Sequence, residues 1–350
     1  MATRNSGPDE VPARERASIR DVADRAGVSV GTVSNVLNRP EVVGAATQAR
    51  VRAAIEELGF RRNESARQLR AGASRTIAYV LLDAANPFFT DVASGIEEVA
   101  EEAGLALFLC NSHENGEREA RYLDLLAEER VRGILITPLD VDGRRLRELP
   151  QLGVPLVLVD RRASEGGHCS VSVDDVLGGE LAVAHLIDRG HRRIAFVGGP
   201  FSIGQVRERH QGGELAVTRA SSNVRLTTVE TAGLNAAEGR QAGARILNAP
   251  AHERPTAAFC ANDLIALGLL QQLTQNGVRI PDDFAIVGYD DIDFAASAAI
   301  PLSSVRQPRH QLGRTAAELL LEEASSDNSH VHRDVRFSPE LVVRTSSTSR

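Results

Sequence analysis

Short apolar runs alternate with amphipathic helical stretches through most of the chain after Arg75. Strands that are apolar throughout and are followed by helices indicate parallel sheets covered by helices on both faces. The roughly 270 residues concerned exceed what one doubly wound sheet needs, so we expect two similar α/β lobes. The runs are TIAYVLL (76–82), LALFLC (105–110), GILIT (133–137), PLVLVD (155–160), RIAFVGG (193–199), TAAFCAND (256–263) and FAIVGYDD (284–291).

Polar residues end several of these runs. Asp83 to Asn86 follow the first run, Asp160 ends another, and Asn262–Asp263 and Asp290 end two later ones. In open parallel sheets, ligands bind beyond the carboxyl ends of the strands. We therefore expect these side chains to converge on one cleft.

The N-terminal segment carries three short helical patterns. Ser18 is placed as the N-cap of the first pattern and Gly27 as its stop, and Ser29 is placed as the N-cap of the second. The third runs from Thr47 to Leu58. Three such helices, the first two joined by an AGVS turn, predict a helix-turn-helix.

The second helical pattern presents short polar side chains outward, as a recognition helix does toward base edges. Asn35 suits the N6 and N7 atoms of adenine, and the hydroxyls can donate to phosphates or bases. For Ser29, helix capping is the structural alternative. The DNA contacts expected from this helix are Ser29, Val30, Gly31, Thr32, Ser34, Asn35 and Asn38.

Charge is distributed unevenly along the chain, whose formal net charge is −7. Residues 1–75 carry 13 arginines against 9 acidic residues, whereas the remainder carries 27 against 38. A basic head on an acidic body favours an N-terminal nucleic-acid module. The chain contains no lysine, which excludes a Walker A lysine, a pyridoxal Schiff base and a lysine general base.

The cysteines and two histidines give no metal-ligand spacing in the sequence. Cys110, Cys169 and Cys260 are scattered, and three thiols suit a reducing cytoplasm better than a disulfide framework. His330 and His332 lie in a polar loop and are interpreted as solvated. We expect no cofactor and no metal ion. No run of 18 apolar residues and no signal-peptide core occurs, so we expect a cytoplasmic protein without a membrane span.

The segment IRDVADRAGVSVGTVSNVLN resembles the head of the lactose/galactose-repressor family, and the order of motifs follows that family over about residues 18–345. The resemblance implies a repressor that binds palindromic double-stranded operator DNA as a homodimer and responds to a small-molecule effector. GFRRNESARQLRAG (59–72) resembles the family's hinge helix, in which a leucine wedges into the minor groove. Leu69 matches that leucine, and the groove-lining positions match Asn63, Ala66 and Arg67.

The recognition helix departs from the commonest family pattern. Asn35 stands where arginine, which would favour guanine, is more usual. Val30 and Gly31 are small and offer methyl contacts or close approach. We therefore expect an operator that differs from the familiar family consensus at the positions these residues read.

The strand ends carry the chemistry of sugar recognition, with planar polar groups for hydroxyls and aromatic rings for C–H faces. They resemble the cleft of ribose-binding proteins, which are homologous to the repressor body. Leu234 stands where an aromatic residue usually covers the ligand, and the segment around Gly213, where Phe or Tyr is usual, is also atypical. The expected effector contacts are Asn86, Phe88, Phe89, Asp160, Arg161, Arg209, Asn262, Asp290 and Gln307.

Individual residues in this set carry separate expectations. Arg209 and Asp290 are expected to face each other across the cleft, because either charge alone would be costly to desolvate. Asp263 is expected to cap the following helix rather than contact the ligand. For Phe89, a purely core role stays open.

The resemblance implies an all-α helix-turn-helix head and an α/β body of two doubly wound parallel-sheet lobes, periplasmic-binding-protein-like of type I. The expected parts are a disordered tail at 1–17, the head at 18–60, a hinge at 61–75 and the body at 76–345. Lobe 1 is expected to comprise about 76–174 plus 295–325, and lobe 2 about 175–294 plus 326–345.

Effector binding is expected to change lobe closure and thereby the order of the hinge helices, with a monosaccharide releasing the protein from DNA. A purine or a protein corepressor is the alternative within the same class. A sugar-binding transport protein would need a signal peptide and would have no use for the head. An enzyme is disfavoured, because no G-x-S-x-G, H-E-x-x-H, P-loop or strand-following G-x-G-x-x-G motif occurs. Candidate dimerisation helices are Phe88–Ala103 and Arg309–Ala324.

Overall fold

A computed structural model of the chain describes residues 17–60, 74–163, 167–220, 223–325 and 330–348. The chain forms two compact units, Met1–Gly72 and Ala73–Arg350, each of which is described by itself. The predicted hinge contacts Asn63, Ala66, Arg67 and Leu69 lie outside the described residues.

The N-terminal unit contains three α-helices, α1 (Ile19–Ala26), α2 (Val30–Asn38) and α3 (Ala45–Leu58). Local sequence signals set their ends. Ser18 and Asp21 form a reciprocal capping box before α1, and Gly27 ends that helix with a φ of 63°. The predicted helix-turn-helix is confirmed. The third helix begins at Ala45, two residues before the predicted start, because Gly44 provides its N-cap.

The helices of this unit pack around one small apolar core. Between α2 and α3 the chain makes a 3-10 turn, η1 (Pro40–Val42). The buried residues come from all three helices, so each amphipathic pattern turns its apolar face to the same centre. They are Val22, Ala23, Ala26, Val33, Val36, Val51 and Ala54.

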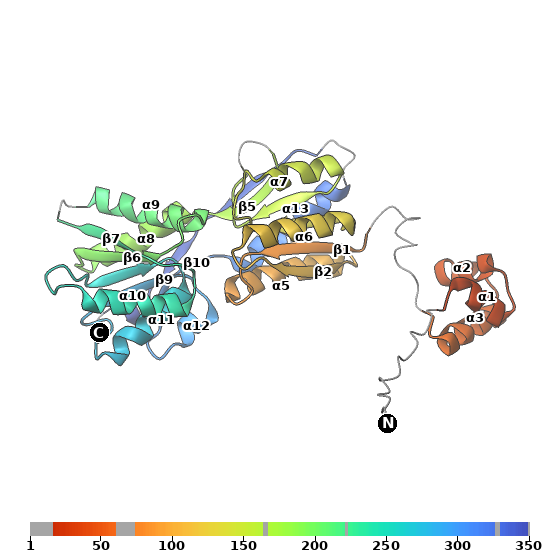
Figure 1. Cartoon of the computed structure of the whole chain (residues 1–350), viewed down its shortest axis with the longest axis horizontal. Coiled ribbons are helices and arrows are strands. Elements are labelled where there is room, and N and C mark those ends of the chain that lie inside the picture. Colours follow the sequence, from red (N-terminus) through yellow and green to blue (C-terminus); the bar gives the residue numbers. More distant parts are fainter. Residues whose placement is uncertain (1–16, 61–73, 164–166, 221–222, 326–329, 349–350) are drawn as a thin grey trace, which may run out of the picture. The chain divides into compact units, whose positions relative to one another are not determined.

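The second unit contains two six-stranded sheets, which define its two lobes (Figure 1). The lobe 1 sheet has the order β11-β5-β4-β3-β1-β2, and all its strands are parallel. The strands are β1 (Thr76–Leu81), β2 (Ala106–Asn111), β3 (Gly133–Ile136), β4 (Leu156–Val159), β5 (Cys169–Val173) and β11 (Asp334–Phe337). The helices are α5 (Pro87–Glu102), α6 (Gly116–Glu128), α7 (Arg144–Glu148), η2 (Leu149–Leu152) and α13 (Arg309–Ser325).

The lobe 2 sheet has the order β12-β10-β9-β8-β6-β7. Only β12 is antiparallel to its neighbour. The strands are β6 (Arg193–Gly198), β7 (Arg225–Glu230), β8 (Ala257–Cys260), β9 (Ala285–Asp290), β10 (Ser303–Arg306) and β12 (Glu340–Val342). The helices are α8 (Asp175–Asp188), α9 (Gly204–Arg219), α10 (Ala236–Asn248), α11 (Asp263–Gln275), α12 (Asp293–Ser297) and η3 (Thr345–Ser347).

The predicted class of two doubly wound α/β lobes is confirmed, and each predicted apolar run contains a strand. Five of the described strands, β5, β7, β10, β11 and β12, were not predicted from apolar runs. The strand β7 reads RLTTVE and has no buried residue, because it lies at a sheet edge. A continuous apolar run is typical of strands buried on both faces, although the run that predicted β2 marks an edge strand whose side chains are exposed or half-buried.

The predicted boundaries between the lobes are wrong in two places. The strand β10 belongs to lobe 2, where it pairs with β9, although residues 295–325 had been assigned to lobe 1. The strand β11 belongs to lobe 1, where it pairs with β5, although residues 326–345 had been assigned to lobe 2. The chain therefore crosses between the lobes after β5, after β10 and after β11. Pairing in parallel sheets is non-local, so sequence position does not reveal these exchanges.

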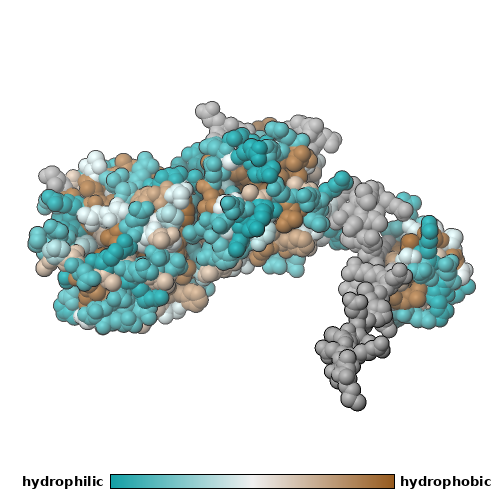
Figure 2. All heavy atoms as spheres, viewed as in Figure 1, coloured by the Kyte–Doolittle hydropathy of each residue, from teal (hydrophilic) through white to brown (hydrophobic). Residues whose placement is uncertain are grey.

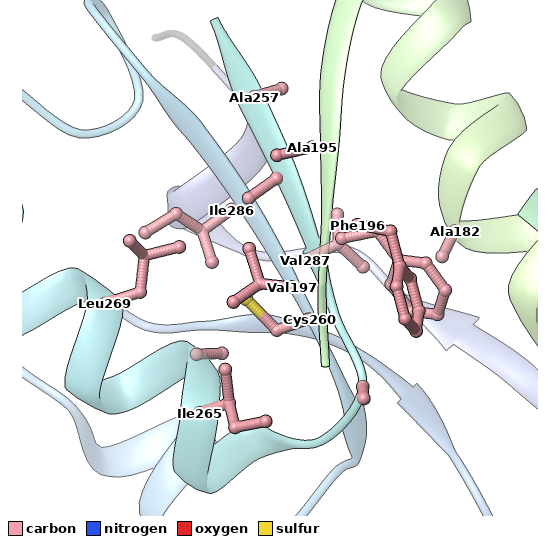
Figure 3. Packing of buried hydrophobic residues seen from close by; sticks show 14 of the residues in the cluster. Ala182, Ala195, Phe196, Val197, Ala257, Cys260, Ile265, Leu269, Ile286 and Val287 are labelled. Atoms are coloured by element: carbon pink, nitrogen blue, oxygen red, sulfur yellow. The ribbon is translucent and has the colours of Figure 1, made fainter. Parts of the chain in front are cut away.

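The core of each lobe lies between its sheet and the covering helices. Figure 3 shows this packing in lobe 2, where Val197 of β6 lies with side chains of β8, β9 and α11, while Phe196 lies on the other face of the sheet beside Ala182 of α8. Cys260 lies fully buried in the same cluster. On the face of the molecule in Figure 2, hydrophilic residues predominate and hydrophobic ones are interspersed. Among the described helices, none is long and apolar enough to cross a membrane.

Reciprocal glycine contacts bring helix pairs close together in both lobes. A Cβ atom on Gly179 of α8 would meet the backbone carbonyl of Arg209, and one on Gly212 of α9 would meet that of Val176. In the same way, a Cβ atom on Gly95 of α5 would meet the backbone of α13, and one on Gly313 of α13 would meet the backbone of α5. Since α9 carries Arg209, the approach of α8 and α9 sets the position of that side chain.

We expect Gly212→Ala to destabilise the second unit by about 1–3 kcal/mol, because the added methyl group must push α9 away from the backbone of α8. Urea unfolding followed by circular dichroism would measure the change in free energy. Gly116→Ala is the matched control, since a Cβ there meets only Leu139 Cδ1 at 4.0 Å. Equal stabilities of the two variants would contradict the expectation.

Candidate functional site

The helix α2 begins where the sequence places its cap. Ser29 Oγ accepts a hydrogen bond from the backbone N–H of Thr32 at 3.1 Å and lies 2.9 Å from the Thr32 hydroxyl. Ser29 thus caps the helix, which was the alternative to a DNA contact for this residue. Val33 and Val36 are buried, so the opposite face of the helix points away from the core.

The seven residues of α2 expected to contact DNA all lie at the surface. Val30 is 41% exposed, Gly31, Asn35 and Asn38 are exposed, and Ser34 is partly exposed. Ser34 Oγ accepts a hydrogen bond from Asn38 Nδ2 at 3.2 Å. Within the described part of the chain, no hydrogen bond holds the Asn35 side chain, so its amide is available to a base edge.

The net positive charge of the N-terminal region lies outside the described helices. Residues 17–60 contain five arginines and five acidic residues, so their net charge is zero. The excess of four positive charges lies within residues 61–75. The net positive charge that can attract DNA phosphates is therefore concentrated in residues 61–75 and not in α1, α2 and α3.

All nine predicted effector residues are buried. Asn86 is the N-cap of α5, and Asp160 and Arg161 follow β4, so these three come from lobe 1. Lobe 2 contributes Arg209 on α9 and Asp290 at the end of β9. The polar members converge at the carboxyl ends of the strands, as the ligand-site rule for parallel sheets predicts.

The carboxylate of Asp290 joins both lobes. Its Oδ1 accepts a hydrogen bond from Gln307 Nε2 at 2.8 Å, and its Oδ2 accepts one from Asn86 Nδ2 at 3.3 Å. Arg209 Nη1 lies 3.7 Å from Oδ1. Because Asn86 belongs to lobe 1 and Asp290 to lobe 2, the hydrogen bond between them connects the two lobes.

Arg209 is held from four directions within lobe 2. Its Nε donates to Asp175 Oδ1 at 2.8 Å, and its Nη1 donates to the carbonyl of Ala261 at 2.7 Å. The guanidinium carbon lies 3.7 Å above the centre of the Tyr289 ring, a cation–π geometry. The expectation that Arg209 and Asp290 face each other across the cleft is wrong, because both belong to lobe 2.

The helix α9 also bonds directly to lobe 1. Gln205 Nε2 donates to the carbonyl oxygen and to the Oδ2 of Asp160, at 3.0 and 2.8 Å. Arg161 Nη1 lies 3.3 Å from Glu208 Oε1. These two pairs and the Asn86–Asp290 bond are polar contacts between the lobes, and Leu139 of lobe 1 adds an apolar one by packing against the lobe 2 cluster.

Several buried polar atoms at this junction make no hydrogen bond to a described residue. Asp160 Oδ1, Gln205 Oε1 and Gln307 Oε1 are acceptors, and Arg161 Nε is a donor. Buried polar groups without partners are rare in folded proteins because each costs free energy. Their concentration at one junction indicates a site built to bind a polar molecule.

The backbone at this junction is strained at two aspartates. Asp160 has a φ of 56° and Asp290 a φ of 102°, and residues other than glycine seldom adopt such positive φ angles. Each ends a parallel strand, one in each lobe. Such strain concentrates at binding sites, where the surrounding structure holds it.

Three buried carboxylates share one guanidinium. Burial raises the pKa of Asp160 to about 8, the charge of Asp175 adds to this, and Arg209 and Gln205 partly offset it. Burial also raises the pKa of Asp290, which Arg209 partly counteracts. The raised pKa values reduce the negative charge of the site, so at neutral pH Asp160 is mostly protonated and can donate as well as accept hydrogen bonds; such a site suits a neutral polar molecule.

Other predicted residues have structural partners. Asn262 caps α11 through a bond from Ile265 N at 2.9 Å, and its Nδ2 donates to the Leu234 carbonyl at 3.0 Å. Asp263 does not cap that helix, contrary to expectation. It lies inside the lobe, where its carboxylate accepts bonds from the Ser304 hydroxyl and a backbone N–H.

The aromatic residues expected to contact the effector lie in a hydrophobic core. Phe88 and Phe89 both belong to the lobe 1 cluster, with ring centres 5.0 Å apart in an edge-to-face arrangement. Gly213 has no room for a ring, because a Cβ atom there would meet Leu226 and Val183 at 3.0 Å. The polar residues therefore dominate the site.

The sequence analysis missed three members of the site, Asp175, Gln205 and Tyr289. Gln205 lies four residues before Arg209 on the same helix face, a spacing that could have revealed it. Asp175 follows β5, which was itself missed. Tyr289 precedes Asp290 and points to the other face of the strand, where only the packing of α9 brings Arg209 over its ring.

Comparison with known proteins matches both units. Residues 18–63 match the bacterial regulatory proteins of the lacI family, and residues 183–347 match a periplasmic binding protein-like domain. The HTH-type transcriptional repressor PurR of Aliivibrio fischeri (strain MJ11) is 36% identical over 335 residues, which span 95% of this chain and 99% of that protein. The chain belongs to the lacI family. It is a DNA-binding transcriptional regulator, and the resemblance found in the sequence is confirmed.

Solved structures of lacI-family members extend the match. The lac repressor dimer bound to operator and the anti-inducer ONPF is 28% identical, with a TM-score of 0.80 and coverage of 96% of this chain and 100% of that one. A LacI family transcriptional regulator from Enterococcus faecium with bound ribose is 30% identical, with a TM-score of 0.70 and coverage of 78% and 98%.

We expect Asn35→Arg to change the preferred operator at the base pair that residue 35 reads, toward guanine, with a discrimination of about 1–3 kcal/mol. Selection of bound DNA from random sequence would measure it. Ala53→Arg, which adds the same charge on the exposed face of α3, is the control and should leave the preferred sequence unchanged. An unchanged preference in the Asn35 variant would contradict base reading by this residue.

We expect Asp160→Asn to gain thermal stability relative to the native chain as pH rises from about 5 to about 8. With a pKa raised from 3.8 to about 8, the folded chain keeps a proton that the unfolded chain has released. Its contribution to the free energy of unfolding therefore falls through that window, by at most about 1.4 kcal/mol per pH unit. Melting temperatures of both proteins across the window test this, and parallel pH profiles would refute it.

Proposed function

We propose that this regulator is a repressor that binds a palindromic operator as a homodimer and is released by a small, neutral, polyhydroxylated effector of the monosaccharide class. The observation that carries the proposal is the buried acidic junction between the lobes, where Asp160, Asp175 and Asp290 surround Arg209.

The chemistry of the junction supports a sugar over an anion. Carboxylates accept hydrogen bonds from hydroxyl groups, and the guanidinium and the side-chain amides pair with adjacent hydroxyls. A phosphate group would find only one guanidinium among three aspartate side chains, and that guanidinium already has partners. The unpartnered atoms Asp160 Oδ1, Gln307 Oε1 and Arg161 Nε supply both acceptors and a donor.

The lobe contacts support a mechanism of release. An effector that bonds to Asp290 or Asp160 replaces the bonds from Asn86 and Gln205 and changes how the lobes meet. The three crossings between the sheets are the segments that absorb such a movement. Lobe 1 receives the chain from the DNA-binding unit at β1, so a change in lobe 1 is transmitted through residues 61–73.

Dimerisation is part of the same proposal. The helices α5 and α13, proposed from the sequence to form the dimer surface, pack against each other through Gly95 and Gly313. Their outer faces carry ion pairs, such as that of Arg314 with Glu98 at 2.6 Å. A homodimer places two copies of α2 on the two halves of a palindromic site.

A purine effector is the second candidate, and one observation favours it. The 36% identity to a repressor named PurR extends over 95% of this chain. The ring N–H groups of a purine could donate to the same carboxylates.

The proposal contains no catalytic step in either case, and a repressor of chromosomal DNA acts in the cytoplasm.

Ligand screening distinguishes these candidates. Ribose and other monosaccharides, ribose 5-phosphate, hypoxanthine and guanine would each be tested for a thermal shift, and any hit for release of operator DNA by fluorescence anisotropy. A neutral sugar at 100 times its Kd should stabilise the protein by about 2.7 kcal/mol and release DNA. A shift with purines alone, or with the phosphate ester alone, would overturn the sugar proposal.

We expect Asp290→Asn to weaken effector binding by roughly 10- to 100-fold, because a hydrogen bond to a charged acceptor is lost. Operator binding without effector should stay intact, since Asp290 lies outside the DNA-binding unit. Asp282→Asn makes the same change at an exposed position and is the matched control. Isothermal titration calorimetry with the effector found above measures the effect, and an unchanged Kd would exclude a role for Asp290.

A further inference from the structure

Four metal-ligating side chains meet at the end of lobe 1 opposite the effector junction. Cys169 begins β5, Glu323 lies on α13, and His330 and His332 lie in the segment before β11. Their ligand atoms all lie within 4.8 Å of one another. The expectation that no ligand cluster lies near these histidines is therefore wrong, although His332 is exposed and His330 partly exposed.

The contacts within this cluster are specific. Cys169 Sγ lies 3.0 Å from His330 Nε2 and accepts a hydrogen bond from the backbone N–H of Arg333 at 3.4 Å. The rings of His330 and His332 have centres 5.4 Å apart at 73°. The Cys169 side chain is fully buried. A thiol and two imidazoles thus approach one point from two segments of the chain.

Two buried atoms of this region make no hydrogen bond to a described residue. Glu323 Oε2 is one of them, and it lies 3.9 Å from His332 Nδ1, too far for a hydrogen bond. The other is Nδ1 of His168, which is 9% exposed and adjoins Cys169. The His168 and His332 ring centres are 6.4 Å apart. An ion between Glu323 and His332 would satisfy the first atom.

We propose that Cys169, Glu323, His330 and His332 form a binding site for a divalent transition-metal ion of the Zn²⁺ class. Thiolate, imidazole and carboxylate are the ligands of tetrahedral Zn²⁺, with bonds of about 2.0–2.3 Å. Such bonds place neighbouring ligand atoms about 3.4–3.8 Å apart, so small side-chain rotations suffice here. Mg²⁺ and Ca²⁺ prefer all-oxygen sites and do not suit this set.

The ion would join two regions that are distant in sequence, the start of β5 and the stretch from the end of α13 to β11. Cys169 belongs to β5, Glu323 to α13, and the histidines precede β11, the strand that returns to lobe 1 after the second crossing from lobe 2. All six strands of this sheet are parallel, so the cluster lies at the amino ends of the strands, as the start of β1 does. Metal binding therefore stabilises the end of lobe 1 at which the chain arrives from the DNA-binding unit.

The site is independent of the proposed effector junction. The effector residues follow the carboxyl ends of the strands, whereas Cys169 stands at the amino end of β5. Metal binding and effector binding can thus succeed or fail separately.

The full chain, freed of metal and of any affinity tag, would be titrated with Co²⁺ and then with Zn²⁺ against a chromophoric chelator. We expect one ion per chain, a thiolate-to-cobalt charge-transfer band, displacement by Zn²⁺ with a Kd on the order of 1 µM or tighter, and a raised melting temperature. Absence of the band, or binding only at millimolar metal, would overturn the proposal.

Matched variants locate the site. Cys169→Ser should abolish the charge-transfer band, and His332→Gln should weaken Zn²⁺ binding by at least about tenfold. Cys110→Ser and His252→Gln make the same changes outside the cluster and should bind as the native chain does. A band that survives in Cys169→Ser would refute the assignment. If that buried substitution prevents folding, His332→Gln decides, because that side chain is 32% exposed.

Discussion

The buried guanidinium of Arg209 is the interaction on which the effector lobe depends. A charge removed from water is tolerated only with close partners, and this one has Asp175, Asp290, the Ala261 carbonyl and the Tyr289 ring. These partners come from α8, β9 and the end of β8, so the charge can be satisfied only when lobe 2 is assembled. The glycine contacts between α8 and α9 permit the short distance that the ion pair needs.

The same charge cluster makes the two lobes sensitive to each other. Asp290 accepts bonds from Asn86 of lobe 1 and from Gln307, which lies at a crossing between the sheets. Polar contacts between lobes can be exchanged for contacts with a polar ligand at little net cost, whereas an apolar interface could not. A regulator that must change the relation of its lobes on binding a small molecule needs this kind of junction.

The two ends of the parallel strands of lobe 1 carry different chemistry. The carboxyl ends provide Asn86, Asp160 and Arg161 to the junction between the lobes, while Cys169 and the histidines before β11 lie at the amino ends. Sheet polarity explains the separation, because loops after strands and loops before strands gather at opposite ends. The chain from the DNA-binding unit enters lobe 1 at the amino ends of the strands, through β1.

The sequence alone determined what short-range rules control. The caps Ser18, Ser29 and Gly27 marked the first two helices, and apolar runs marked the strands β1 to β4, β6, β8 and β9. Strand ends also pointed to Asp160 and Asp290. Tertiary structure alone decided which lobe holds β10 and β11, that Arg209 pairs within its own lobe, and that Cys169 meets His330, 161 residues away. Those facts depend on strand pairing and helix packing between distant segments, and residue spacing along the chain carries no record of them.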